Sequence, residues 1–185
     1  MKKNIPILKT RRLILRELWE SDLKGIQENL NDLEVSKQLK TIPYPCTQDD
    51  SKDYMKYYTD EYKKKNKENY GYGIEYNKRI IGMACLHMIN KIQMNCFLDY
   101  WIGKKYWRKG IGFEACTALI DFTFKKLGLK TIESSAFADN IASQKLLEKL
   151  HFKKKHLLLN HAKSQATGEV HDLQTFLLTK EDWIT

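Results

Sequence analysis

The segment from Gly110 to Leu127 constrains the fold of this chain more than any other. Its apolar residues recur every three or four positions, which is the spacing of a helix that buries one face. Gly128 follows and suits a helix C-cap, because glycine readily adopts the left-handed conformation that commonly ends a helix. This is the clearest helix of the sequence, and the other elements are predicted around it.

Segments with strand character lie on both sides of this helix. Tyr70–Tyr76 and Arg79–Met88 flank Asn77-Lys78, which is typical of a hairpin turn, and Met94–Ile102 predicts a third antiparallel strand. Further strands are predicted at Arg11–Leu18, Thr131–Ala138, Phe152–Leu159 and Val170–Leu178. Strands therefore surround the helices, and the predicted class is mixed α/β.

Two more helices are predicted with defined starts. One begins at Thr47, because Asp50 three residues later nearly completes a capping box, and another runs from Asn140 to Leu150. The chain has 185 residues, 42% of them hydrophobic, and shows no repeat, Gly/Ser linker or proline-rich tract. We expect one domain over residues 1–185, since single domains commonly contain about 100–200 residues.

The net charge is strongly positive, with 32 Lys and Arg against 23 Asp and Glu and a formal charge of +9. This balance favours an anionic partner, which could be a nucleic acid, a membrane surface or a nucleotide cofactor. Many of the charges fall in runs, namely Lys63 to Lys65 and Lys153 to Lys155, that we interpret as solvated surface. Charge alone does not choose among these partners.

The four cysteines, Cys46, Cys85, Cys96 and Cys116, are far apart and show no C-x-x-C spacing, so we interpret them as reduced, buried thiols. The apolar stretch from Ile5 to Leu8 is too short for a signal peptide. No apolar run approaches the roughly 18 residues that would span a bilayer. The five histidines show no compact spacing with other ligand residues, and no metal site is predicted. A cytoplasmic enzyme or binding protein is expected.

A glycine loop, Trp107-Arg108-Lys109-Gly110-Ile111-Gly112, leads into the long helix. The first amides of a helix lack intrahelical partners, and the helix dipole adds positive potential there. Glycines let an anion approach these amides closely, so the loop is a candidate pyrophosphate site. The basic side chains that crowd the same approach are Lys104, Lys105, Arg108 and Lys109.

The same glycines also fit the dinucleotide-binding pattern, because Ala115 stands three residues after Gly112 and Glu133 lies about 20 residues further on. The dinucleotide unit, however, needs its first glycine directly after a buried strand, and here Lys104 to Lys109 intervenes. It also needs further strand and helix repeats, which the rest of the chain lacks. A nicotinamide cofactor is therefore the weaker interpretation of the loop.

Several motifs occur together in an order that resembles one known superfamily. The stretch YWIGKKYWRKGIGFEA is followed by a helix, a strand, and N-x-x-S at Asn140 to Ser143 ahead of LLEKLHF. A T-x-R-L-x-L-R strand runs from Thr10 to Arg16, and Asp172 and Asp182-Trp183 stand near the end. These features resemble the GNAT superfamily of N-acetyltransferases, and more narrowly its ribosomal-protein N-terminal (alanine/serine) acetyltransferase branch. The resemblance spans nearly the whole chain. It implies a mostly antiparallel central sheet with one parallel, splayed strand pair, flanked by about four helices.

The resemblance implies acetyl-CoA as the acyl donor. Gly110 and Gly112 match the fourth and sixth positions of the superfamily's Q/R-x-x-G-x-G/A loop, whose amides would bind the pyrophosphate. Trp107 stands at the first position, where Gln or Arg is usual. The residues implied to bind the donor are Trp101, Ile102, Trp107, Arg108, Lys109, Gly110, Ile111, Gly112 and Asn140.

Two of these implications concern the pantetheine arm and the thioester. The main chain of Trp101 and Ile102 would pair with pantetheine as an added strand does, where their strand splays from Ser134 to Phe137. Asn140 would contact the same arm, although it is equally suited to be a helix N-cap. Ser143 would lie near the thioester sulfur and protonate the departing thiolate, directly or through water.

The expected mechanism is direct attack of a neutral amine on the thioester, with the oxyanion held by a strand amide near Ile102. A peptide α-amine has a pKa of roughly 8 and needs only modest help to lose its proton. Asp99 is the first candidate base, because it lies beside the expected thioester and shares a strand face with Phe97. Family members often carry a glutamate in place of Phe97. Glu17 and Glu75 are alternatives that could act through water.

The sequence departs from the family at Leu150-His151-Phe152, where a glycine usually precedes the phenylalanine. His151 must then avoid a left-handed turn or adopt it at some cost. His161 and His171, near the closing hairpin, could line the acceptor cleft.

The expected reaction is acetyl transfer to a primary amine. A protein N-terminus is favoured as the acceptor by the Thr10 to Arg16 strand and the terminal Asp182-Trp183, and a polyamine, amino acid or aminoglycoside is the alternative. A non-catalytic acyl-CoA-binding or nucleic-acid-binding domain is a further alternative. Tyr62 to Tyr72, with its lysines, comes nearest to a nucleic-acid surface, but a helix face with core tyrosines explains it more simply. No membrane partner is expected, and the chain should be a monomer or homodimer.

Overall fold

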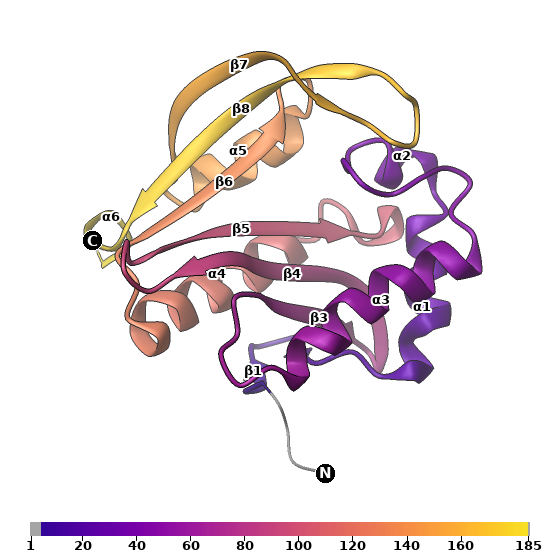
Figure 1. Ribbon diagram of the computed structural model, residues 1–185, viewed down its shortest axis with the longest axis horizontal. Coiled ribbons are helices and arrows are strands. Elements are labelled where there is room, and N and C mark those ends of the chain that lie inside the picture. Colours follow the sequence, from indigo (N-terminus) through magenta and orange to yellow (C-terminus); the bar gives the residue numbers. More distant parts are fainter. Residues whose placement is uncertain (1–4, 185) are drawn as a thin grey trace.

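One eight-stranded sheet forms the centre of the molecule. The computed structural model describes residues 5–184, whose arrangement is shown in Figure 1. The strand order is β1-β2-β3-β4-β5-β6-β8-β7, and all neighbouring strands are antiparallel except β5 and β6. The strands are β1 (Leu8–Lys9), β2 (Ile14–Arg16), β3 (Tyr70–Tyr76), β4 (Arg79–Asn90), β5 (Asn95–Ile102), β6 (Thr131–Phe137), β7 (Lys153–Lys163) and β8 (Val170–Thr179).

Helices cover both faces of the sheet. In Figure 1, α1 and α3 lie in front of β3 and β4, whereas α4 and α5 lie behind the sheet. The α-helices within residues 5–184 are α1 (Leu23–Leu30), α2 (Leu33–Ser36), α3 (Gln48–Lys63), α4 (Ile111–Phe122), α5 (Ile141–Lys149) and α6 (Lys180–Ile184). Four of them are longer than five residues, in agreement with the predicted mixed α/β class and helix number. None of the helices in this range combines the length and apolarity needed to cross a bilayer.

Two local predictions are confirmed. Asn77 and Lys78 have φ values of 49° and 62°, which is the conformation of a type I′ hairpin turn between β3 and β4. Thr47 and Asp50 form the capping box at the start of α3, with Thr47 N donating to Asp50 Oδ2 at 2.8 Å and Asp50 N donating to Thr47 Oγ1 at 3.2 Å.

Two predicted elements differ from the structure. The strand expected over Arg11–Leu18 is limited to β2, because a tight turn, in which Thr10 N donates to Leu13 O at 3.0 Å, precedes it. The helix expected to reach Leu127 ends as α4 at Phe122, and its last turn widens into a π-helix over Thr123–Leu127.

Both long rear helices end in a left-handed residue. Gly128 has a φ of 70° after the π-helical turn, as predicted for a C-cap. His151 has a φ of 66° after α5, so it adopts the conformation that glycine takes more easily. Of the two outcomes expected for His151, it therefore takes the left-handed turn rather than avoiding it.

All four cysteines are unpaired and buried, as predicted. Burial raises the pKa of the Cys85 thiol and of the Cys96 thiol to about 12. These thiols stay protonated near neutral pH.

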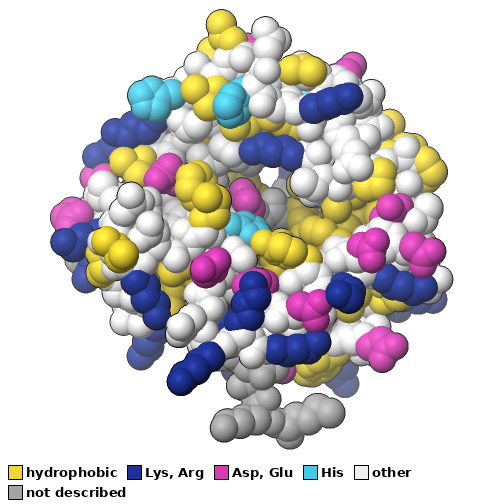
Figure 2. All heavy atoms as spheres, in the orientation of Figure 1, with side chains coloured by type: hydrophobic (Ala, Val, Ile, Leu, Met, Phe, Trp, Pro, Cys, Tyr) yellow, Lys and Arg dark blue, Asp and Glu magenta, His cyan; other side chains and the backbone are white. Residues whose placement is uncertain are grey.

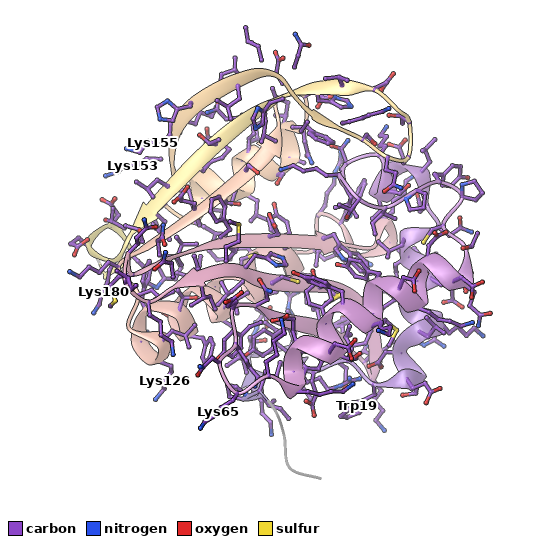
Figure 3. All side chains as sticks on the ribbon, viewed as in Figure 1. Trp19, Lys65, Lys126, Lys153, Lys155 and Lys180 are labelled. Carbon is purple, nitrogen blue, oxygen red and sulfur yellow. The ribbon has the colours of Figure 1, made fainter. Side chains whose placement is uncertain are left out.

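One buried ion-pair network joins β2 to β3 and to the turn before α1. The guanidinium of Arg16, which is 4% exposed, donates to Asp22 Oδ2 at 2.7 Å and to Glu75 Oε2 at 2.6 Å. The ring of Trp19, at the lower edge of Figure 3, covers this guanidinium at 3.7 Å. The network therefore holds β2, and the turn that follows it, against β3.

Replacement of Arg16 by Met should lower the free energy of unfolding by about 3–5 kcal/mol, because two carboxylates lose their buried partner. Urea unfolding followed by circular dichroism measures this loss. The control is Lys24→Met, since the Lys24–Glu28 pair is solvent-exposed, with its charged atoms 3.9 Å apart. Equal losses in the two variants would contradict a structural role for the Arg16 network.

Candidate active site

β5 and β6 begin as neighbours and then part. Asn95–Phe97 pairs with Thr131–Glu133, and the ladder between the two strands ends there. At the point of divergence Ser134 Oγ donates to Leu98 O at 2.8 Å. Beyond it, β5 stays with β4 while β6 turns away with β8, as Figure 1 shows. The main chain of Ile102 therefore borders an opening on the β6 side, which is the predicted splay, whereas Trp101 pairs with Met83 of β4.

The opening faces a hollow on the front of the molecule. Figure 2 shows this hollow between the β7/β8 hairpin and the layer of α1 to α3, with histidine and acidic side chains beside it. Lys40, from the loop between α2 and α3, reaches across it and donates from Nζ to Ser135 Oγ of β6 at 3.3 Å. The two sides of the hollow thus come from distant parts of the sequence.

The predicted glycine loop lies between the end of β5 and the start of α4. Arg108 and Gly110 have positive φ values of 58° and 71°, and α4 begins directly after them at Ile111. Glu114 N donates to Gly110 O at 3.0 Å, which is the first main-chain bond of α4. The amides before Glu114 at the helix start can therefore donate hydrogen bonds to an anion. The exposed side chains of Lys104, Lys105 and Lys109 lie around these amides.

Trp107 ties this loop to β5. Its indole Nε1 donates to the carbonyl oxygen of Ile102 at 2.6 Å. The tryptophan that stands in place of the usual Gln or Arg therefore fixes the distance between the end of the strand and the helix start.

A second clamp joins the loop to the N-terminal segment. Arg12 donates from Nη1 to Lys109 O at 2.9 Å and from Nε to Glu114 Oε2 at 2.7 Å. Thr10 Oγ1 donates to Glu114 Oε1 at 2.6 Å. Although partial burial opposes ionisation, the hydrogen bonds from Thr10 and Arg12 lower the pKa of Glu114. The carboxylate stays charged and holds Arg12 against the loop.

The start of α5 approaches β5 from behind the sheet. Asn140 Oδ1 accepts a hydrogen bond from Ser143 N at 3.1 Å, so Asn140 is the N-cap of α5. The Ser143 hydroxyl lies 2.8 Å from the hydroxyl of Tyr100 on β5, and the two are hydrogen-bonded. Burial raises the pKa of Tyr100, which keeps its hydroxyl protonated. The pair spans the gap between β5 and α5.

Gly112 makes this approach possible. A Cβ at Gly112 would lie 3.0 Å from Leu146 Cδ1 of α5 and 3.8 Å from the Tyr100 ring. A larger residue at this position would therefore press on the Leu146 side chain of α5.

Asp99 lies on the opposite face of β5, toward α3. Its side chain is 57% exposed, and its Oδ2 is 3.7 Å from His87 Nε2 on β4. Trp101 is on the same face and donates from Nε1 to Tyr54 Oη of α3 at 2.9 Å. Asp99 is thus a solvent-accessible carboxylate on the same face as the aromatic pair of Trp101 and Tyr54.

The alternative carboxylates lie on strands further from the opening. Glu75 of β3 is engaged by Arg16, and Glu17 follows β2 and accepts a hydrogen bond from Arg16 Nη1 through its main-chain carbonyl at 2.9 Å. Asp99, on β5 itself, lies nearer to the opening than either of them.

The remaining histidines and basic runs have other surroundings. His171 stacks on Phe137, with ring centroids 4.4 Å apart, and its Nδ1 is 3.2 Å from Asp139 Oδ2, whereas His161 is exposed on β7. Lys153 and Lys155 lie at the edge of the molecule in Figure 3, away from the hollow, and Lys153 is paired with an acid of α6. Among residues 5–184, no group of three or more His, Cys, Asp or Glu side chains could hold a metal ion.

The acetyltransferase (GNAT) domain family matches residues 12–153, a stretch that contains Arg12 and Glu114 of the clamp, the loop, the diverging strands and the start of α5. This chain belongs to the GNAT acetyltransferase family. It is an acyl-CoA-dependent N-acetyltransferase.

Relatives of this GNAT enzyme cover almost its whole length. The uncharacterized N-acetyltransferase p20 of Bacillus licheniformis is 28% identical over 95% of this chain and 97% of its own. RimL, a ribosomal-protein alpha-N-acetyltransferase solved with coenzyme A, is 17% identical with a TM-score of 0.82 and covers 94% of this chain and 98% of its own. The spermidine N-acetyltransferase of Vibrio cholerae, solved with CoA and spermine, is 18% identical with a TM-score of 0.79. The match covers 95% of this chain and 100% of the Vibrio chain. At these identities the two structures demonstrate a shared fold.

Three contacts in the candidate site of this GNAT enzyme were not foreseen from its sequence. The Arg12–Glu114 clamp joins residues 102 positions apart, and only the T-x-R motif hinted at it. Tyr100 lies next to the predicted Trp101 but points to the other face, where Ser143 is. His87 carries no motif at all, and only strand register brings it beside Asp99.

Two glycines allow the loop to be tested against a matched control. Gly110 and Gly128 have nearly the same φ, 71° and 70°, so replacement of either by Ala should cost about 1 kcal/mol of stability. Only Gly110→Ala should weaken acetyl-CoA binding, by about tenfold or more, the equivalent of one lost hydrogen bond to a charged group. Isothermal titration calorimetry measures both affinities, and equal affinities in the two variants would refute the assignment of the loop.

Proposed function

We propose that this GNAT enzyme acetylates a primary amine that is a protein N-terminal α-amine, with a cytoplasmic location. The observation that supports a peptide acceptor is the open front hollow, into which the main-chain edge of β5 faces beyond its last pairing with Glu133. An extended chain could reach the thioester through this hollow. The similarity to RimL agrees with such an acceptor.

The donor would be held by main-chain groups. The amides from Arg108 to Gly112 would bind the pyrophosphate, because they lie at the positive end of α4. The amide of Ile102 would donate to the pantetheine arm, which would take the place of the missing β6 neighbour, whereas the main chain of Trp101 stays paired with Met83 of β4. Asn140 would add a side-chain contact while it caps α5.

Asp99 would accept the proton of the acceptor ammonium, since its exposed carboxylate lies on the front face beside Trp101. A strand amide near Ile102 would stabilise the oxyanion that forms on attack. Ser143 would donate a proton to the departing thiolate from the rear side. Tyr100 orients Ser143, because its hydroxyl can donate to Ser143 Oγ and leave the serine proton directed at the sulfur.

Replacement of Ser143 by Ala should lower kcat by about 100-fold, the usual contribution of a positioned proton donor. Tyr100→Phe should lower kcat by about tenfold, because it removes one hydrogen bond and leaves Ser143 in place. Free thiol release measures kcat, and KM for acetyl-CoA should change little. The matched control is Tyr72→Phe, since Tyr72 is buried and its hydroxyl has no hydrogen-bond partner among the described residues. If Tyr72→Phe and Tyr100→Phe behave alike, Tyr100 has no catalytic role.

A small-molecule amine is the second candidate acceptor, and the similarity to the Vibrio cholerae spermidine enzyme supports it. A non-catalytic binding domain is less well supported, because four of the six lysines in the two basic runs pair with acids. Lys63 pairs with Asp60, and Lys154 pairs with Glu148.

Acetyl-CoA should raise the melting temperature of the protein, as any ligand of the native state does, by a shift equivalent to about 2.7 kcal/mol at 100 times its Kd. Turnover should then be measured as free thiol across N-terminal peptides, spermidine, amino acids and aminoglycosides. Highest kcat/KM with a peptide is expected. Preference for spermidine would replace the protein acceptor with a small one, and a thermal shift without turnover would indicate a binding domain.

A further inference from the structure

A histidine and an aspartate lie side by side on the front face of the sheet. His87 is on β4 and Asp99 is on the neighbouring β5, and the register pairs His87 with Phe97 and Cys85 with Asp99. The two polar side chains are therefore diagonal neighbours on one face. His87 Nε2 and Asp99 Oδ2 are 3.7 Å apart, and a small rotation of the exposed Asp99 side chain would bring them into a hydrogen bond.

The two side chains differ in exposure. The Asp99 side chain is 57% exposed, whereas the His87 side chain is 19% exposed. A molecule in the hollow would therefore meet Asp99 first.

Burial favours the neutral form of the His87 imidazole, against the charges that face it. On α3 these are Glu61, whose Oε1 accepts a bond from Lys64, and the ring of Tyr58, with centroids 6.0 Å apart. Cys85 is the titratable neighbour on β4, and its thiol is protonated. Burial lowers the pKa of His87, and the charges of Asp99 and Glu61 oppose this effect only in part. A neutral imidazole can accept a proton at physiological pH.

Proton removal from an amine is easiest when the pKa of the proton acceptor is close to the pKa of the amine. Carboxyl groups have reference pKa values near 4, imidazole near 6.5 and peptide α-amines near 8. A carboxylate that passes its proton to an imidazole is therefore a better sink for an ammonium proton than a carboxylate alone.

We propose that His87 is the proton acceptor behind Asp99 and that it positions this carboxylate for catalysis. The inference rests on the proposed function, because it assumes that the acceptor amine enters the front hollow. Asp99 takes the proton as an N–H bond of the ammonium breaks, and His87 Nε2 takes it as the new O–H bond breaks. The imidazolium then releases the proton to water. The freed lone pair forms the new C–N bond, and the attacking nitrogen loses its second proton to water as the amide forms. The electrons of the C–S bond leave on sulfur, which takes a proton from Ser143, and water reprotonates the Ser143 hydroxyl.

The test compares kcat/KM from pH 5.5 to 9.5 in the wild type, His87→Gln, Asp99→Asn and the double variant. Protonated His87 cannot accept a proton, so the wild type should lose activity as the pH falls through the pKa of His87. His87→Gln should lower kcat by about 10- to 100-fold and abolish this acid limb, with KM for acetyl-CoA unchanged. The double variant should be no slower than the slower single one. The control is His156→Gln, an exposed histidine on β7 that should keep the wild-type profile.

A second measurement does not depend on turnover. Titration of the His87 imidazole by NMR should show a lower midpoint in Asp99→Asn than in the wild type, because the Asp99 charge favours the imidazolium. An unchanged midpoint, a retained acid limb in His87→Gln, or losses that multiply in the double variant would each overturn the proposal. A lowered midpoint in a protein that turns over no amine would place the failure in the proposed function instead.

Discussion

The parting of β5 and β6 is the constraint on which the rest of the site depends. Main-chain groups in the interior of a sheet are almost always paired, because an unpaired buried N–H or C=O is costly. Here the pairing stops at Phe97 and Glu133. The Ser134 hydroxyl donates a hydrogen bond to Leu98 O, where a main-chain amide of a neighbouring strand would otherwise be expected. Each strand keeps its outer neighbour, so the sheet opens in its middle without losing either half.

The alternation of side chains along β5 distributes the chemistry between the two faces of the sheet. Successive residues of a strand point to opposite sides. Tyr100 therefore meets Ser143 behind the sheet, while Asp99 meets His87 in front. In our proposal, proton removal and proton delivery use opposite faces of β5. The base and the acid are therefore kept apart, although Asp99 and Tyr100 are adjacent in sequence.

Much of the fold followed from local signals that act over a few residues. The capping box at Thr47, the type I′ turn at Asn77-Lys78 and the helix start after Gly110 each depend on residues close in sequence. The Arg11–Leu18 strand was predicted too long, because the turn before Leu13 is set by contacts that the strand pattern does not contain.

The site was less predictable, because its contacts cross the fold. The glycine loop and Ser143 could be placed through motifs of the family. The clamp of Arg12 on Glu114 and the partners of Asp99 and Ser143 required strand register and helix packing, which no short motif encodes. Gly112 illustrates the difference, since its motif suggests a phosphate contact, whereas its packing against the Leu146 side chain of α5 becomes visible only in the fold.

The burial of the four cysteines has a consequence for an enzyme whose family releases coenzyme A. Each turnover leaves a free thiol beside the protein, and thiol exchange or oxidation to a mixed disulfide requires an accessible thiolate. Cys85 and Cys96 are enclosed in the core, and their pKa values of about 12 leave almost no thiolate at neutral pH. The enzyme is thereby protected from covalent capture of its own product, and its activity should be insensitive to the redox state of the coenzyme A pool.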